Sequence, residues 1–223
     1  MLPPRLLCLS LMACPSAVAA ATMDESWCRN GMFTVQNSPV GLGRVAAGER
    51  AHFLNDIQGC PGPDSKCRLK SYLVAGDSVV TGRTLGKYIC IYYLDKEGGI
   101  AGWVDASLIR PLAVRNDPPL SAWIGRWSDY GNPVVRFFSR NGKIMAKGEA
   151  AWPSFNPPRD IAPGGPHVGE ISEVVQTSGN RAYAAECEIT FTLLGDLLVA
   201  ADPKMQCGGA NVSFSGVYRR LKR

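Results

Sequence analysis

Few residues in this 223-residue chain stand in patterns that could carry out catalysis. His167 stands three residues before Glu170, and such a pair could act as general acid and base. Glu186 and Glu188 flank Cys187, and strand alternation would place both carboxylates on one face, where they could bind a cation or exchange protons. A histidine bonded to a backbone carbonyl and a solvated acidic face are the commoner forms of these patterns, and we favour them.

Other catalytic and metal-binding motifs are absent from the sequence. It contains no G-x-S-x-G nucleophile motif and no local cysteine–histidine pairing typical of a thiol enzyme. It contains no C-x-x-C, and neither His52 nor His167 neighbours a second ligand at zinc spacing. No lysine follows Gly208-Gly209, so this pair is not a phosphate loop. We therefore predict no catalytic residue, no metal site and no cofactor.

The cysteine count favours disulfides. Of the eight cysteines, Cys8 and Cys14 lie in the first twenty residues. The six others are Cys28, Cys60, Cys67, Cys90, Cys187 and Cys207. An even number outside the first segment is typical of disulfide-bonded proteins in oxidising compartments.

The pairing of these cysteines is open in part. Cys187 and Cys207 are the only two in the second half of the chain, so we predict that they pair with each other. The other four allow three pairings. We favour Cys67–Cys90, which would tie the entry of the first domain to its central strand, and Cys28–Cys60, which would hold the N-terminal segment.

The first twenty residues have the three parts of a secretory signal peptide. Arg5 gives a positive start, residues 6–13 are mostly apolar, and Ser16–Ala20 supplies small residues for cleavage. We therefore predict a signal peptide at residues 1–20 and a mature chain in the periplasm or secreted. The alternative is a lipoprotein anchored through Cys14, because Leu11-Met12-Ala13-Cys14 is similar to a bacterial lipobox. No later segment has the roughly 20 apolar residues that a transmembrane helix needs.

The formal net charge of +5 does not indicate a particular class of binding partner. Four basic residues cluster at the end of the chain, namely Arg219, Arg220, Lys222 and Arg223. Such a tail could touch an acidic envelope surface, but is more often simply solvated. We predict no nucleic-acid partner, because no basic stripe alternates with aromatic residues.

Short strand patterns separated by turn residues run through the whole chain and predict an all-β fold. In the first half the strongest strand is Tyr88–Leu94, and Ser107-Leu108-Ile109 indicates a short helical turn. The prolines at 118 and 119 favour a linker at 116–120. The expected domains are therefore residues 21–115 and residues 121–223.

The second half reads as a meander of hairpins. Asn141-Gly142 between apolar runs is a strong hairpin turn signal. Further strands are expected at 169–176, 182–194, 197–201 and 212–219, after a proline-rich loop at 152–166. Such a meander closes most easily into a small antiparallel barrel, since closure removes exposed strand edges.

Aromatic residues are the best binding candidates. Tyr72, Tyr92, Tyr93 and Trp103 cluster in the first half and could form a groove that stacks on sugar rings or proline-rich peptides. Strand alternation puts Tyr92 and Tyr93 on opposite faces, so at least half of the four should be core. Three further tryptophans, Trp123, Trp127 and Trp152, are expected in the core or at the mouth of the second barrel.

Two stretches resemble known groups of proteins. Gly76–Val80, the strand Lys87–Tyr93 and Gly102-Trp103-Val104 before Ser107-Leu108-Ile109 resemble a bacterial SH3-type domain over about residues 66–112. That resemblance implies a small five-stranded barrel of a kind that binds cell-wall glycan or peptide, or serves as a spacer.

The second stretch lies in the C-terminal half. Trp123–Trp127, His167–Glu170 and Cys207–Arg219 resemble a group of uncharacterised exported proteobacterial proteins, which implies location and fold only.

We therefore expect a non-catalytic envelope protein that binds peptidoglycan or an envelope protein. One alternative is an inhibitor of a secreted enzyme such as lysozyme, with Cys207-Gly208-Gly209 as a protruding loop. Another is a hydrolase that uses His167 and Glu170.

Overall fold

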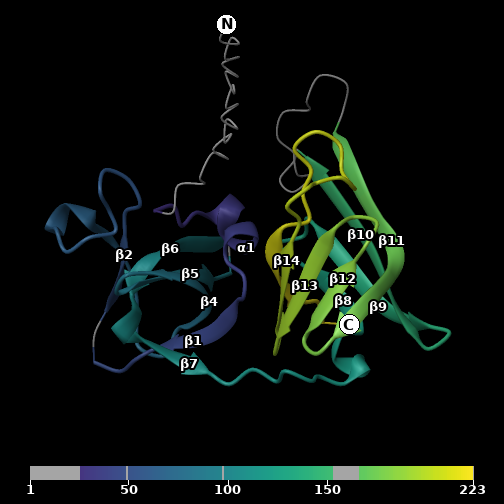
Figure 1. Cartoon of the computed structure of the whole chain (residues 1–223), viewed down its shortest axis with the longest axis horizontal. Coiled ribbons are helices and arrows are strands. Elements are labelled where there is room, and N and C mark those ends of the chain that lie inside the picture. Colours follow the sequence, from purple (N-terminus) through teal and green to yellow (C-terminus); the bar gives the residue numbers. More distant parts are fainter. Residues whose placement is uncertain (1–25, 49, 97, 153–165, 223) are drawn as a thin grey trace, which may run out of the picture.

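The structure is a computed structural model that describes residues 26–48, 50–96, 98–152 and 166–222. It is mostly β, which confirms the all-β prediction, and its strands form one antiparallel sheet and one closed barrel (Figure 1). The expected signal peptide at residues 1–20 and the alternative lipid anchor at Cys14 lie outside the described residues.

The first half forms a seven-stranded antiparallel sheet in the order β3-β2-β6-β5-β4-β1-β7. Its strands are β1 Gly41–Val45, β2 Ala51–Leu54, β3 Arg68–Leu73, β4 Ser78–Leu85, β5 Tyr88–Leu94, β6 Gly99–Asp105 and β7 Ile109–Leu112. The SH3-like assignment implies five strands and remains a prediction.

Local sequence explains the most regular part of this sheet. β5 has the bounds that its apolar run predicts, and five of its seven residues are buried. Gly86, with a φ of 57°, makes the tight turn from β4 into β5, a backbone conformation that glycine adopts without strain. The short helical turn expected after β6 is the 3-10 turn Ala106–Leu108.

The second half is a closed eight-stranded barrel, as the hairpin pattern predicts. Its strands are β8 Gly125–Ser128, β9 Val134–Arg140, β10 Lys143–Trp152, β11 His167–Ser178, β12 Arg181–Ala184, β13 Ile189–Leu194, β14 Leu197–Ala201 and β15 Gly216–Arg220. Each strand pairs with its neighbour in sequence, and β15 pairs with β8 to close the barrel.

Turn chemistry and core packing shape the barrel. Asn141 and Gly142 have φ values of 52° and 73° in the turn between β9 and β10, which confirms the hairpin prediction. The interior is filled by the barrel's own side chains, with the rings of Phe137 and Phe191 in an edge-to-face contact at 5.2 Å. Trp123 and Trp127 are wholly buried there, as expected.

Two strand predictions in the barrel are wrong. The expected strand 182–194 is broken by the turn 185–188, where the carboxylate of Glu173 accepts hydrogen bonds from the backbone N–H groups of Glu186 and Cys187. Glu186 and Glu188 therefore belong to a turn and do not share a strand face. The last strand begins at Gly216 rather than 212, because the buried Asp202 carboxylate instead accepts the N–H of Phe214.

The disulfides are Cys28–Cys90, Cys60–Cys67 and Cys187–Cys207. The last confirms its prediction, whereas Cys67–Cys90 and Cys28–Cys60 are wrong. Cys67 directly precedes β3, and β2 and β6 lie between β3 and β5, which carries Cys90. Three strand spacings are about 14 Å, and a disulfide joins Cα atoms less than about 7 Å apart.

The disulfides also bear on location. Three of them indicate an oxidising, extracytoplasmic environment. No helix within the described ranges is long and apolar enough to cross a membrane.

The sheet and the barrel share an apolar interface built around the short helix α1, Phe33–Gln36 (Figure 1). Phe33 is wholly buried and packs on the ring of Tyr92 at 5.4 Å. The barrel contributes Leu194, Val199 and Val217 to the same cluster. α1 therefore fills the space between two sheets that do not pair with each other.

Polar contacts flank this interface. The guanidinium of Arg219 on β15 donates to the carbonyl of Leu94 at 2.7 Å. The hydroxyl of Tyr130, in the turn after β8, lies within hydrogen-bond distance of the carbonyls of Asp95 (2.5 Å) and Gly98. The loop that follows β5 is thus fixed to the barrel.

We predict that the Cys28–Cys90 bridge stabilises the fold more than Cys60–Cys67. The two bridges span sequence separations of 62 and 7 residues, and the chain-entropy model assigns them about 4 and about 2.5 kcal/mol. The Cys28→Ala/Cys90→Ala variant should therefore lose more unfolding free energy in urea than Cys60→Ala/Cys67→Ala. Equal losses, or a larger loss for the second variant, would contradict this expectation.

Candidate functional site

The structure does not bring the four aromatic binding candidates together. Trp103 is wholly buried, and its indole N–H donates to the carbonyl of Ser26 at 2.5 Å. Tyr92 is buried at the interface, and Tyr93 packs from the other face of β5 against a different apolar cluster. Neither Trp103 nor Tyr92 is available to stack on a ligand, because both are enclosed by the protein.

Tyr72 is the one exposed member of the set, with 40% of its surface accessible. It lies on β3, the edge strand, where its ring contacts the ring of His52 at 5.2 Å and the guanidinium of Arg50 at 4.4 Å. A small hollow on the same sheet is lined by residues such as Phe53, Leu69 and Ile100, and none of the four candidates lines it. The predicted aromatic groove is therefore not assembled.

The acid/base pair considered for β11 is not assembled either. Buried residues alternate along β11 at 169, 171, 173 and 175, so His167 shares their inward parity and Glu170 faces outward. The ring of His167 instead lies 6.1 Å from that of Trp152, which is 43% exposed at the end of the barrel.

The Cys207-Gly208-Gly209 segment does not protrude. Gly208 pairs with Gly169 on β11, and the N–H of Gly209 donates to the carbonyl of Val168 at 3.0 Å. A Cβ at Gly169 or Gly208 would meet neighbouring backbone closer than real Cβ atoms approach. These glycines are needed for close packing of the segment against β11, and the inhibitor alternative remains a prediction.

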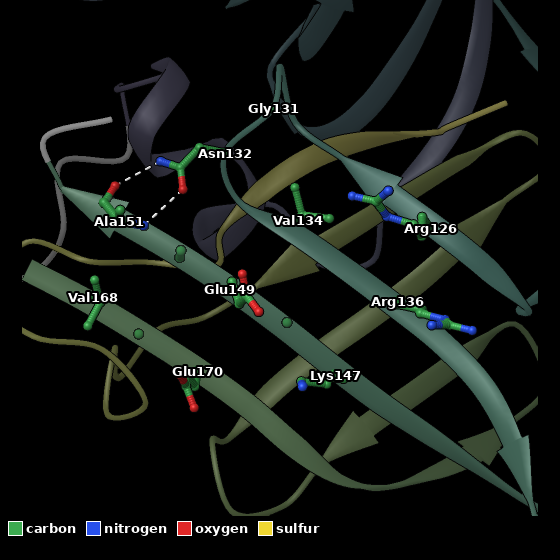
Figure 2. A pocket seen from close by; sticks show the side chains of 13 residues that line it. Arg126, Gly131, Asn132, Val134, Arg136, Lys147, Glu149, Ala151, Val168 and Glu170 are labelled. Atoms are coloured by element: carbon green, nitrogen blue, oxygen red, sulfur yellow. Dashed lines mark hydrogen bonds between the residues drawn. The ribbon is translucent and has the colours of Figure 1, made fainter. Parts of the chain in front are cut away.

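The best candidate site is a groove of about 510 Å³ on the outer face of the barrel. It lies over β8, β9, β10 and β11, and its charged side chains project from these strands (Figure 2). The lining residues are Arg126, Gly131, Asn132, Val134, Arg136, Lys147, Gly148, Glu149, Ala150, Ala151, Val168, Gly169 and Glu170. We call this surface the barrel groove.

Three cations form a row across the barrel groove. Register pairs Arg126 with Arg136 and Arg136 with Lys147, so the three occupy neighbouring positions on β8, β9 and β10. All three are exposed, and none makes an ion pair among the residues that the structure describes. Like charges directly opposite each other destabilise a sheet, and no ion pair among the described residues offsets this cost.

Two carboxylates form a second row beside the cations. Glu149 on β10 is paired in register with Glu170 on β11 and, on its other side, with Val134 on β9. Both glutamates are exposed and, within the described parts of the chain, neither is in an ion pair. The groove therefore presents two separated patches of opposite charge.

The side chain of Asn132 holds the turn at one end of the barrel groove in place. Its side-chain amide donates to the carbonyl of Ala151 and its side-chain oxygen accepts the N–H of the same residue, both at 2.8 Å (Figure 2). The turn after β8 is thereby bound to β10. Gly148 and Gly169 line the groove between the charged positions and are buried, and a Cβ on Gly148 would meet Phe214 and Val135.

Asp129 lies at the other side of that turn, toward the seven-stranded sheet. Burial raises the pKa of its carboxyl to about 6. Burial and then the charge of Asp129 raise the pKa of Tyr92 and of Tyr218, which face it from β5 and β15. Gly216 leaves room for the carboxyl, since a Cβ there would overlap it.

The described residues do not form a metal-binding cluster. They contain no group of three or more histidine, cysteine, aspartate or glutamate side chains that could hold a metal ion. Sequence reasoning missed the barrel groove, although Lys147-Gly148-Glu149 shows alternating charge within a strand pattern that could have signalled an exposed charged face.

Comparison with known proteins adds no neighbour. No family model, no curated protein and no solved structure matches the chain.

We predict that Asp129 makes the fold less stable as pH rises. Its carboxyl has a pKa of about 6 in the folded chain against an ordinary 3.8, so the folded state favours the protonated form. The stability that protonation supplies is present below the ordinary pKa and is lost as pH rises through the folded one, a change on the order of 3 kcal/mol. Asp129→Asn should remove this dependence.

Urea unfolding of wild type and Asp129→Asn at pH values below 4 and above 7 measures the effect. The variant should gain stability relative to wild type at the higher pH. The control is Asp117→Asn, which changes an exposed aspartate in the connection between sheet and barrel. If Asp129→Asn and Asp117→Asn show the same pH dependence as wild type, Asp129 does not titrate as described.

Proposed function

We propose that this chain is an exported, non-catalytic envelope protein that binds a charged cell-wall component through the barrel groove. It would act in the periplasm or outside the cell. The observation that carries the proposal is the row Arg126–Arg136–Lys147, which makes no ion pair among the described residues.

The cation row lowers the stability of the barrel unless an anion binds to it. Like charges at directly opposite positions on neighbouring strands destabilise a sheet. Exposed cations could be spread over the barrel at no such cost, and a bound anionic group would turn the row into a favourable contact. Hydrogen bonds to charged groups contribute about 1.5–3 kcal/mol each.

Cell-wall material fits this surface chemically. Its peptides carry carboxylates and amines, which complement the cations and the Glu149–Glu170 pair respectively. The resemblance of residues 66–112 to SH3-type domains supports the same target class, because that family binds wall glycan or peptide. Since Trp103 and Tyr92 are buried, we assign binding to the barrel and a spacer or scaffold role to the seven-stranded sheet.

We predict that purified peptidoglycan retains the folded protein and that this retention depends on the cation row. Arg136→Ala/Lys147→Ala should weaken binding at least tenfold, because two charge-assisted contacts are removed. Retention of wild type should also fall with added salt, since the groove is exposed. The measurement is co-sedimentation with insoluble wall material over a range of protein concentrations.

The matched control is Arg140→Ala/Lys143→Ala. These two cations are paired in register on the same two strands, β9 and β10, but lie at the hairpin turn outside the groove. They should leave binding unchanged. Equal losses in the two variants would show only a general charge effect, and no retention of wild type above a denatured sample would end the proposal.

A further inference from the structure

The two charged rows of the barrel groove lie a fixed distance apart. Lys147 and Glu149 are two residues apart on β10, so their Cα atoms are separated by one strand repeat of about 7 Å. The register carries this offset across the strands, because Arg136 lies opposite Lys147 and Val134 lies opposite Glu149. The groove thus has a cationic side and an acidic side that run parallel across the barrel (Figure 2).

Each side matches a different ligand group. The cationic side offers two guanidinium groups and one ammonium, which bind a carboxylate through charge-assisted hydrogen bonds. On the acidic side Glu149 and Glu170 are directly opposite, so their carboxylates repel each other. A ligand ammonium has three donors and can bond both carboxylates at once.

The two sides also exclude ligands of a single charge. A polyanion that follows the cations would meet two carboxylates about one strand repeat away, and a polycation would meet the three cations. Selectivity that rests on such repulsion needs a ligand with both charges correctly placed.

We propose that the barrel groove binds the free ends of a short peptide, with an amine at Glu149 and Glu170 and a carboxylate at the cation row. An extended dipeptide with free termini spans about 7 Å at most, which is about the spacing between the Cα atoms of the two rows. This inference rests on the proposed function and names the wall component as a zwitterionic peptide unit.

The rest of the lining limits the side chains of the peptide. Small residues surround the charged rows, namely Gly148, Ala150, Ala151 and Gly169, with Val134 and Val168 as the larger apolar contacts. Ala-Ala is the probe because it carries both charged ends and only small side chains. The groove volume of about 510 Å³ lies within the range of small-molecule sites.

The experiment titrates wild type with Ala-Ala in both enantiomeric forms by calorimetry or ligand-observed NMR. The comparison peptides are N-acetylated Ala-Ala, Ala-Ala amide, single alanine and trialanine. Wild type should bind free Ala-Ala in at least one enantiomeric form, and blocking either end should weaken binding about tenfold. Alanine and trialanine measure how affinity depends on the distance between the two charged ends.

Two variants assign the ends. Glu149→Gln should weaken free Ala-Ala but leave the affinity for the N-acetylated peptide unchanged, because that peptide has no ammonium to lose. Arg136→Gln should weaken free Ala-Ala and leave Ala-Ala amide unchanged. The control Arg140→Gln should bind every peptide as wild type does. Equal binding of free and blocked peptides, or loss of both in each variant, would overturn the inference.

The same proteins distinguish this inference from the proposed function. If peptidoglycan retention depends on Arg136 and Lys147 but Ala-Ala neither binds nor competes, the peptide assignment is wrong and the proposed function stands. If competition comes instead from an anionic polymer without amines, the ligand is a polyanion and the inference is also wrong. If Arg136→Ala/Lys147→Ala leaves retention unchanged, the proposed function itself fails.

Discussion

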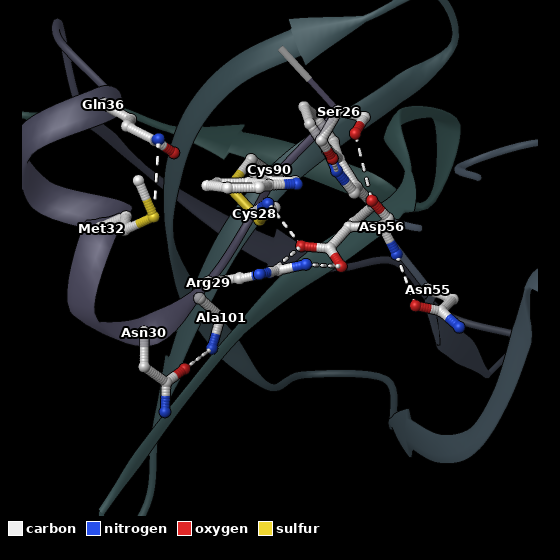
Figure 3. A network of polar contacts seen from close by, with 12 residues as sticks. Ser26, Cys28, Arg29, Asn30, Met32, Gln36, Asn55, Asp56, Cys90 and Ala101 are labelled. Carbon is white, nitrogen blue, oxygen red and sulfur yellow. Dashed lines mark hydrogen bonds and ion pairs between the residues drawn. A yellow bond between two sulfur atoms is a disulfide. The ribbon is translucent and has the colours of Figure 1, made fainter. Parts of the chain in front are cut away.

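Phe33 is wholly buried between the seven-stranded sheet and the barrel, and the rest of the molecule depends on its being held there. The Cys28–Cys90 bridge ties the segment before it to the central strand β5. The carboxylate of Asp56 accepts hydrogen bonds from the N–H of Cys28 at 3.1 Å and from Arg29 at 2.7 Å (Figure 3). This segment therefore supplies the apolar layer that joins two sheets which have no strand pairing in common.

Two asparagine side chains form hydrogen bonds with backbone groups at places where the neighbouring strand does not extend. Asn30 donates to the carbonyl of Gly99 at 2.7 Å and accepts the N–H of Ala101 at 2.5 Å, on the side of β6 that β2 meets only at its far end (Figure 3). Asn132 binds both backbone groups of Ala151 in the same way. An amide carries one donor side and one acceptor side, like a peptide group, so it satisfies backbone groups that a missing strand would otherwise leave unpaired.

Strands and turns set by neighbouring residues could be predicted from the sequence, as could the closed barrel, whereas the strand order of the first sheet could not. The strand Tyr88–Leu94 and the turn at Asn141 and Gly142 follow from local apolar runs and positive-φ residues. The pairing of Cys28 with Cys90 depends on which strands are neighbours in the sheet. No local sequence pattern predicts that strand order. β1 and β2 were likewise not foreseen, since each is only four or five residues long.

The barrel groove was missed for the same reason. Arg126, Arg136 and Lys147 are far enough apart in the sequence that each reads as an ordinary exposed cation, and only the strand register sets them side by side. A row built on paired strands is held rigidly, whereas charges on loops would move apart to relieve their repulsion. The turn that ends this surface is bound to β10 by Asn132 and to the first sheet by Tyr130. The turn of residues 129–133 therefore links the groove to the loop after β5, the strand whose Tyr92 packs on Phe33.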